Sequence, residues 1–313
     1  MNSKRDDNKT VRILDMYKQF AKGGIVKKEE WTEKWGISEK TIDRDKKEIE
    51  EYLQNEYPES SIDYDRKTKS YRLIGKEHMA LSDHEIFAVC KVLLDARAFN
   101  KKEMEQIIDH LLRLSFNQKT IEGAIGNEQH HYKPVKHSKD LVERIWFFSQ
   151  NIKTQNVLDV QYKKQDGTVK AYKINPLGML FNEYYFYVVA EKHGEENSGS
   201  RVFRLDRFLN YSVCENDQRF KIDYGKRFQE GEFRERIQFM YTGELTTIKF
   251  KFKGDSLEAV LDRLPTAEVI SEENGEALIK ANVYGEGVKK WLLSQGAGLR
   301  WLVQLVIGRK WLI

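Results

Sequence analysis

Side chains able to contact a polyanion are concentrated in the segment that begins at Ser38 and reads SEKTIDRDKKEIEEYL. If this segment is a helix, its cationic and hydroxyl side chains gather on one outer face. An arginine there can donate two hydrogen bonds to guanine or clamp a phosphate, and hydroxyls at a helix N-terminus can donate to phosphate oxygens. The residues of this face are Ser38, Lys40, Thr41, Arg44 and Lys47. The arrangement is compatible with a helix that lies against a nucleic acid.

Acidic residues in the same segment support a second interpretation, in which the helix is only a solvated surface helix. Glu39, Asp43 and Asp45 offset much of its positive charge, and the spacing of Glu39 and Asp43 places like charges one turn apart. Charge alone therefore favours the solvated helix. For Asp45, we expect a basic partner, or a role in positioning Arg44, rather than an orientation toward DNA.

A second group of aromatic and cationic residues lies on predicted strands between residues 157 and 213. Guanidinium groups bind phosphate through two hydrogen bonds, and aromatic faces stack on bases, so such a group suits an anionic ligand with a flat ring. The candidate ligand-binding residues are Tyr162, Lys173, Tyr187, Arg204 and Arg207. The alternative is that the strand aromatics form the core and that Arg207 pairs with Asp206 or another nearby acid.

Catalytic and metal-binding patterns find little support in the sequence. The seven histidines show no HExxH-type spacing, and neither a phosphate-binding loop nor a Gly-x-Ser-x-Gly elbow is present. Cys90 and Cys214 lie far apart and are expected to be buried free thiols. We therefore expect no enzyme, no metal and no cofactor, although Ser, His and Asp side chains distant in sequence could still converge.

The elements that must position the first group occupy residues 9–74. A helix is predicted to end at Gly23-Gly24, and its apolar stripe consists of Val11, Leu14, Tyr17 and Ala21, with Ile13 and Phe20 beside them. A second helix from Lys27 to Trp35 ends at Gly36, which permits a sharp turn, and Ser38 suits the N-cap of the third.

The third helix has its own apolar stripe, formed by Ile42, Ile49 and Leu53, which we expect to face the other two helices. Ser61 to Ile74 then alternates around a turn-like DRKTKS and predicts a β-hairpin. The basic residues of this hairpin could touch the DNA backbone as a wing. They are Arg66, Lys67 and Lys69.

Two further regions complete the chain. Residues 81–150 read as helices that begin at caps Ser82 and Asn100. Their apolar stripe, Ile86, Val89, Leu93 and Leu94, fits core packing better than an interface. Residues 157–213 alternate with period two around a turn at Gln165-Asp166-Gly167, and predict a small twisted sheet or barrel. From Ile237, strands and helices alternate as in a small α+β unit.

Bulk composition limits the possible partners. The chain has 313 residues, a third of them charged, yet a formal net charge of only +4. Because few cations are uncompensated, one copy can neutralise only a few phosphates. DNA binding should therefore require a dimer that reads two half-sites. No window approaches the ~18 apolar residues of a membrane span, and the N-terminus lacks the apolar segment of a secretion signal. We expect a cytoplasmic protein without membrane contact.

Three segments in this order resemble those of WYL-domain transcriptional regulators. SEKTIDRD, Ser38 to Asp45, is similar to the recognition helix of DeoR-type regulators. PLGMLFNEYYFYVVAE, Pro176 to Glu191, is similar to the segment that carries the eponymous Trp-Tyr-Leu triad, here Phe186, Tyr187 and Val188. FRLDR, Phe203 to Arg207, also matches the family closely. The resemblance extends over nearly the whole chain.

The resemblance implies a multidomain α+β protein. Its domains would be a winged helix-turn-helix at 1–75, a helical connector or dimerisation region at 76–150, a WYL domain with an Sm-like or SH3-like β-barrel at 151–222, and a WCX-like α+β extension at 223–313.

The implied function is that of a homodimeric DNA-binding regulator, a repressor at a palindromic operator, whose WYL domain senses a nucleotide or a nucleic-acid fragment. Two alternatives stay open. One is an RNA- or single-stranded-DNA-binding accessory protein of a phage-defence system, and the other is an enzyme that processes nucleic acid.

Overall fold

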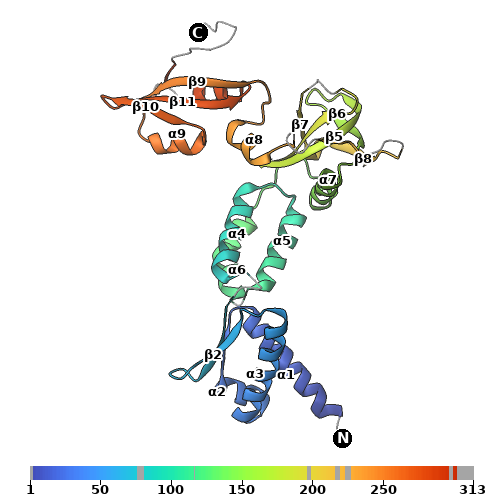
Figure 1. Cartoon of the computed structure of the whole chain (residues 1–313), viewed down its shortest axis with the longest axis vertical. Coiled ribbons are helices and arrows are strands. Elements are labelled where there is room, and N and C mark those ends of the chain that lie inside the picture. Colours follow the sequence, from blue (N-terminus) through green and yellow to red (C-terminus); the bar gives the residue numbers. More distant parts are fainter. Residues whose placement is uncertain are drawn as a thin grey trace. The chain divides into compact units, whose positions relative to one another are not determined.

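The computed structural model describes residues 3–75, 81–115, 117–195, 199–215, 219–222, 227–295 and 299–301. The chain forms two compact units, Met1–Pro134 and Val135–Ile313, and each is described by itself (Figure 1). Within the described residues there are ten α-helices and three β-sheets, which confirms the predicted α+β class. The residues predicted to form the connector are divided between the two units.

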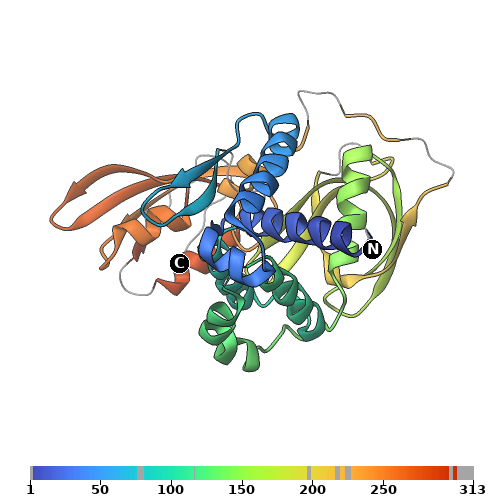
Figure 2. The ribbon, with the colours of Figure 1, turned by 90° about the horizontal axis from the view of Figure 1, so that it is seen from below.

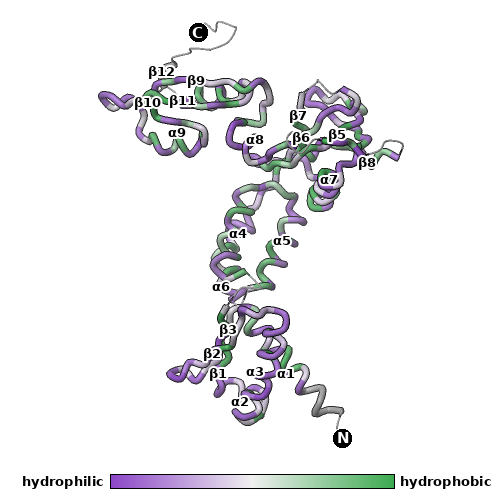
Figure 3. Tube along the Cα trace, in the orientation of Figure 1, coloured by the Kyte–Doolittle hydropathy of each residue, from purple (hydrophilic) through white to green (hydrophobic). Residues whose placement is uncertain are grey.

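The first unit begins with three helices and three strands. They are α1 (Ser3–Ala21), β1 (Ile25–Lys27), α2 (Lys28–Trp35), α3 (Glu39–Glu56), β2 (Ser61–Asp65) and β3 (Ser70–Ile74). The three helices and the hairpin were predicted, whereas the three-residue strand β1, which pairs antiparallel with β3, was not. Figures 1 and 2 show the β2–β3 hairpin extending away from the helices of this unit, and Figure 3 shows its tip to be hydrophilic.

One core joins the helices to the small sheet. It contains Met16 and Phe20 of α1, Trp31 of α2, and the predicted stripe of α3, Ile42, Ile49 and Leu53. The stripe predicted for α1 is correct only in part: Phe20 is buried and Ile13 and Tyr17 pack against the core, but Val11 is 54% exposed and Leu14 is 60% exposed. The buried face of α1 runs through Arg12, Met16 and Phe20.

Three helices, α4 (Asp83–Ala96), α5 (Lys101–Leu114) and α6 (Gln118–His130), complete the first unit. Both predicted caps are present: Ser82 and Glu85 form a capping box, and the side chain of Asn100 accepts a hydrogen bond from the backbone N–H of Glu103 at 2.9 Å. Ile86 and Leu94 are buried as predicted, but Val89 is exposed.

The second unit begins with α7 (Val142–Thr154) and a curved five-stranded sheet. The strands are β4 (Leu158–Lys163), β5 (Val169–Asn182), β6 (Tyr185–Lys192), β7 (Arg201–Arg204) and β8 (Phe208–Val213). Their order is β7-β6-β5-β4-β8, and the edge strands β7 and β8 are joined only by the 3-10 turn η1 (Leu205–Arg207). The predicted turn between β4 and β5 is present, with Gly167 at φ 85°.

Two strands that are not neighbours in this sheet nevertheless touch. The backbone N–H of Arg204 on β7 donates to the Tyr162 hydroxyl on β4 at 3.1 Å, although β6 and β5 separate these strands in the sheet. The sheet must therefore curl strongly, as in a small barrel.

Residues 230–301 contain the second sheet of this unit, which has its own core. Helix α8 (Glu230–Arg236) precedes β9 (Leu245–Phe252), α9 (Leu257–Arg263), β10 (Glu268–Glu273), β11 (Glu276–Tyr284), α10 (Gly287–Ser294) and β12 (Leu299–Trp301). The strand order is β10-β11-β9-β12, and alternate residues of β11 face a core that includes Phe250, Ile279 and Trp291.

Candidate nucleic-acid interface

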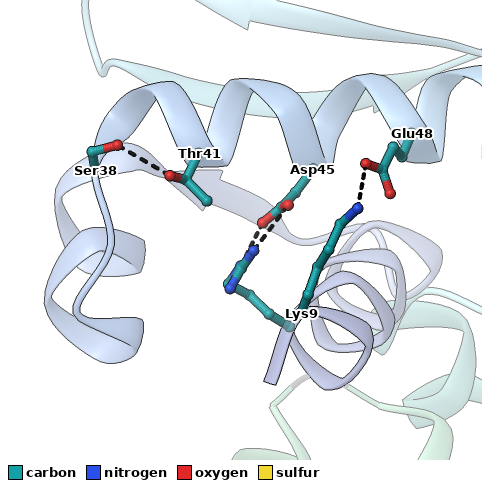
Figure 4. Close-up of polar contacts among 6 residues, drawn as sticks. Lys9, Ser38, Thr41, Asp45 and Glu48 are labelled. Carbon is teal, nitrogen blue, oxygen red and sulfur yellow. Dashed lines mark hydrogen bonds and ion pairs between the residues drawn. The ribbon is translucent and has the colours of Figure 1, made fainter. Parts of the chain in front are cut away.

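The turn that leads into α3 follows the predicted geometry at two residues. Gly36 lies in the left-handed region, with φ 61° and ψ 39°, and its N–H donates to the Thr32 carbonyl. Ser38 occupies the N-cap position, but its side chain does not cap a backbone N–H. Its hydroxyl lies 3.1 Å from that of Thr41 (Figure 4), so this pair occupies the place of a capping box.

The inner side of α3 is fixed by an ion pair as well as by its apolar stripe. Asp45 is fully buried and accepts two hydrogen bonds from Arg12 of α1, at 2.5 Å from Nε and 3.0 Å from Nη2. One turn further on, Lys9 of α1 donates to Glu48 at 2.8 Å (Figure 4). Asp45 therefore has the basic partner that we expected, and the two pairs hold α3 against α1.

The remaining acids at the start of α3 are paired with Lys28, the first residue of α2. Its ammonium nitrogen lies 2.7 Å from Asp43 Oδ1 and 3.8 Å from Glu39 Oε2. The hydroxyl of Tyr71 on β3 also donates to Asp43, at 2.5 Å. All three acids that made the helix look neutral thus have cationic partners on α1 or α2.

The outer side of α3 carries the predicted cations. Lys40 and Arg44 are exposed, and within the described part of the chain neither has a hydrogen-bond or ion-pair partner. Lys47 is also exposed and lies 3.7 Å from Glu51, a separation at which two solvated side chains attract only weakly. Three cations therefore line one exposed face, beside Ser38 and the half-buried Thr41.

The contacts among Lys28, Asp43 and Tyr71 shift the pKa values of all three residues. Burial alone would lower the pKa of Lys28, but hydrogen bonds to Asp43 and Tyr71 outweigh it and raise that pKa. Burial would raise the pKa of Asp43, and the hydrogen bonds from Lys28 and Tyr71 lower it. Burial and the bond to Asp43 raise the pKa of Tyr71 to about 12.

The hairpin presents its three predicted cations, Arg66, Lys67 and Lys69, as exposed residues of the β2–β3 turn. The Asp65 carboxylate accepts hydrogen bonds from the backbone N–H groups of Lys67 (2.8 Å) and Thr68 (3.4 Å), which lowers its pKa. Lys69 has a positive φ of 48°, and its carbonyl accepts from the Lys28 N–H at 3.1 Å. Hydrogen bonds within the turn therefore stabilise it, and a backbone hydrogen bond joins it to α2.

Two of the predicted ligand-binding residues, Tyr187 and Arg204, are direct cross-strand partners on β6 and β7. The Arg204 guanidinium carbon lies 3.5 Å from the ring centroid of Tyr185, and its nitrogens donate to both Asp206 oxygens, at 3.0 and 2.8 Å. Burial would lower the pKa of Arg204, but Asp206 outweighs it and raises that pKa. Burial raises the pKa of Tyr187 to about 12.

The other three predicted ligand-binding residues differ in where they lie. Tyr162 is a core residue, whose ring packs 5.0 Å from Phe203 and 5.2 Å from Phe208, so it supports Arg204 from within. Lys173 is exposed and lines a separate surface hollow of about 620 Å³ formed by β4, β5 and β8. Arg207 is half-buried in η1 and donates a side-chain hydrogen bond to the Tyr162 hydroxyl. Tyr162, Tyr187, Arg204 and Arg207 are thus linked by direct contacts, whereas Lys173 lies on a different surface.

Sequence reasoning missed four residues of these clusters. Tyr185 lies two residues before Tyr187, so the alternation of a strand could have placed it on the same face. Asp206 was considered as a partner of Arg207, whereas the structure pairs it with Arg204. Lys28 and Tyr71 carry no local sequence signal, because their partner Asp43 lies on another element.

The described residues form no candidate metal site. Among them, no group of three or more His, Cys, Asp or Glu side chains is placed to hold a metal ion. Among the helices so described, none combines the length and apolar character that crossing a membrane requires.

Comparison with known proteins identifies one region. A search of curated proteins finds no match. Among solved structures, proteasome accessory factor B/C of Arthrobacter aurescens is similar with 16% identity and a TM-score of 0.29, over 95% of this chain and 44% of that chain. A CRISPR Cas-related protein is similar with 11% identity and a TM-score of 0.35, over 95% and 79%. This chain thus spans less than half the length of the first. Residues 148–213, from α7 to β8, match the WYL domain.

Proposed function

We propose that this protein is a DNA-binding transcriptional regulator in which residues 1–75 act as a winged helix-turn-helix. One observation carries the proposal: Lys40, Arg44 and Lys47 form an exposed cationic face on α3, while Glu39, Asp43 and Asp45 pair with Lys28 and Arg12. A helix whose acids are neutralised from behind can present its cations to a polyanion. Charge counting along the segment misses this separation.

In the proposed complex the N-terminal half of α3 enters the major groove and the β2–β3 hairpin lies on the neighbouring backbone. Arg44 can donate two hydrogen bonds to a guanine, and Lys40 and Lys47 can neutralise phosphates. Ser38 and Thr41 stand at the helix N-terminus, where N–H groups and hydroxyls favour a phosphate. Arg66, Lys67 and Lys69 would contact phosphates from the hairpin.

We further propose a homodimer that acts as a repressor at a palindromic operator. One copy offers few unpaired cations, so two copies reading half-sites about 34 Å apart would supply the required affinity. The helices of the connector, residues 76–150, would join the copies, and residues 223–313 would form the WCX-like extension. No enzymatic activity and no cofactor form part of this proposal.

The WYL region would receive the effector on its Sm-like or SH3-like barrel. Tyr185 and Tyr187 offer ring faces, and Arg204 offers a guanidinium that Asp206 already holds in place. Such a cluster suits a nucleotide or a nucleic-acid fragment. A ligand that binds one dimer geometry better than another would shift the protein toward that geometry and change its operator affinity.

The DNA-binding proposal is tested by titrating the full chain onto fluorescent duplex DNA from the region upstream of its own gene. The same sequence as single-stranded DNA and as RNA provides the comparison. We expect the duplex to bind at least ten times more tightly than either single strand. Equal or tighter binding of a single strand would contradict the proposal.

The effector proposal is tested with Arg204→Ala and Arg207→Ala, with Arg201→Ala, an exposed arginine on β7, as the matched control. Duplex binding is measured with and without short oligonucleotides as effectors. We expect the first two variants to keep operator binding and lose the response, and Arg201→Ala to keep both. A full response in Arg204→Ala would contradict the effector site.

A second candidate function is that of an RNA- or single-stranded-DNA-binding accessory protein of a defence system. Tyr184, 40% exposed, meets Tyr185 edge to face, as Tyr185 meets Tyr187, and aromatic side chains near a cation such as Arg204 suit the bases of single strands. Preference for a single strand in the titration above would favour this function. Cleavage of a labelled oligonucleotide with magnesium or manganese would favour an enzyme.

A further inference from the structure

Three polar side chains from three elements meet beneath the start of α3. The Lys28 ammonium from α2 and the Tyr71 hydroxyl from β3 both donate to Oδ1 of Asp43, at 2.7 and 2.5 Å. Lys28 is only 8% exposed and Tyr71 is 7% exposed, whereas the Asp43 side chain is 46% exposed, so the two donors are buried and their shared acceptor lies at the surface. We name this group the Lys28–Asp43–Tyr71 cluster.

The cluster is continuous with the β2–β3 hairpin. Tyr71 is the cross-strand partner of Tyr64 on β2, and their ring centroids are 5.0 Å apart. The Lys28 ammonium lies 5.1 Å from the Tyr64 ring and 5.3 Å from the Tyr71 ring, which is within range of cation–π attraction. The backbone N–H of Lys28 also donates to the Lys69 carbonyl, where the hairpin turn ends.

A buried ammonium is a costly way to fill this space if stability is its only role. Replacing buried ion pairs by apolar residues of similar volume is often neutral or stabilising. An ion pair with a directed hydroxyl does differ from apolar packing in one respect, because it fixes one relative orientation of the groups that it joins. Here those groups belong to α3 and to the hairpin.

We infer that the Lys28–Asp43–Tyr71 cluster is a positioning unit that holds the β2–β3 hairpin at a set orientation to α3. In that orientation Arg66 and Lys67 reach phosphates while Arg44 faces base edges. The inference rests on the proposed DNA binding and adds to it the residues that align its two contact surfaces. Lys28, Asp43 and Tyr71 themselves do not touch DNA.

The salt dependence of duplex binding measures this role. The logarithm of the affinity falls with the logarithm of salt concentration, with a slope of about 0.9 for each phosphate neutralised. A hairpin variant, Arg66→Ala with Lys67→Ala, should lower the slope by about 2. Lys28→Met in the full chain should lower it by a similar amount. Tyr71→Phe, which removes no charge and keeps the ring, should lower it by part of that amount.

Combining the changes separates positioning from other effects. If Lys28 acts through the hairpin, Lys28→Met should cause no further loss of slope in the hairpin variant. Lys9→Met is the matched control, because it removes a lysine that pairs with α3 from α1, away from the hairpin, and should leave the slope near the wild-type value. Thermal unfolding of each variant records any loss of stability.

Two results would overturn the inference. One is an unchanged slope in both Lys28→Met and Tyr71→Phe, even with a lowered Tm, since the cluster would then be only structural. The other is that Lys28→Met lowers the salt slope by the same amount in the hairpin variant as in the wild-type protein, since Lys28 would then act on DNA directly. If the wild-type chain fails to bind duplex DNA, the proposed function fails first and the inference fails with it.

Discussion

At the scale of single residues, the pair Arg12–Asp45 explains why a polar helix can have a buried side. Asp45 lies between Ile42 and Ile49 on the inner face of α3, where an unpaired carboxylate would be strongly unfavourable. Arg12 supplies two hydrogen bonds from α1, and both side chains are nearly excluded from solvent. The pair therefore fixes how α3 is rotated about its own axis, and so which residues it exposes.

This geometry predicts a large effect on stability. Asp45→Asn or Arg12→Met leaves one buried partner without its charge complement, which should lower the free energy of unfolding by about 3–5 kcal/mol. The double variant Arg12→Met with Asp45→Asn should lose clearly less than the sum of the two single changes. Urea unfolding followed by circular dichroism gives these values.

Glu48→Gln is the control for that prediction. Its partner Lys9 is 43% exposed, and an exposed pair contributes only about 0–1 kcal/mol. If Asp45→Asn costs no more than Glu48→Gln, the ion pair does not hold α3 as described.

At the scale of elements, the turn between α2 and α3 sets the direction in which α3 begins. Gly36 has φ 61°, and a Cβ added there would meet no atom within 4 Å, so only the backbone conformation opposes a larger residue. The glycine is therefore required for its conformation rather than for space.

Replacing Gly36 by alanine should lower the free energy of unfolding by about 1 kcal/mol, because the left-handed conformation is unfavourable for a residue with a Cβ. Gly123→Ala is the matched control: it lies inside α6 with open space around it, and should raise stability by about 0.8–1 kcal/mol. Chemical unfolding checks both signs. Equal effects at the two glycines would contradict the role of the Gly36 turn.

The contact of α2 with α3 also predicts a dependence on pH. The pKa of Asp43 lies below its ordinary value of 3.8 in the folded protein. Its contribution to stability is therefore fully present above that ordinary value and is lost as the pH falls through the lowered pKa. Lys28 stays charged throughout this range, because its pKa is raised.

We expect the Tm of the wild-type protein to fall more steeply between about pH 5 and pH 2.5 than the Tm of Asp43→Asn. Asp65 and Asp166 also have lowered pKa values, but they titrate equally in both proteins and cancel in the difference. Identical Tm profiles of the two proteins would show that the Lys28–Asp43 contact does not form in solution.

Local patterns predicted the elements better than they predicted the contacts. Ile42, Ile49 and Leu53 recur at helical spacing, and Ser82 and Asn100 cap helices through neighbours three residues away, so sequence alone was sufficient. Arg12 was not predicted on the buried face of α1, because its burial depends on Asp45, which lies far along the chain. Strand β1 is too short to show a period.

The same limit applies to the candidate sites. Exposed Lys40 and Arg44 were predicted from helical geometry, but their freedom from the neighbouring acids depends on Lys28, on a different helix. On the WYL barrel, Tyr187 and Arg204 meet as cross-strand partners, whereas the register of β4 and β5 carries Lys173 to a different surface. Strand register is a tertiary property that residue types alone did not fix.

At the scale of the whole molecule, net charge is a poor guide to the partner. The chain carries only +4 overall, yet ion pairs on the inner side of α3 leave its outer side cationic. The position of the charges therefore decides which partner fits, and the central claim is that the outer face of α3 binds duplex DNA.

That claim is tested most directly by duplex affinity of the full chain with Lys40, Arg44 and Lys47 all changed to alanine. The control changes Lys101, Lys102 and Arg113 to alanine, which removes the same charge from exposed positions on α5 of the same unit. We predict that the α3 variant loses at least about 100-fold in affinity and up to about 2.7 in salt slope, while the control stays within about threefold of the wild type. Equal affinities of the two variants would contradict the account.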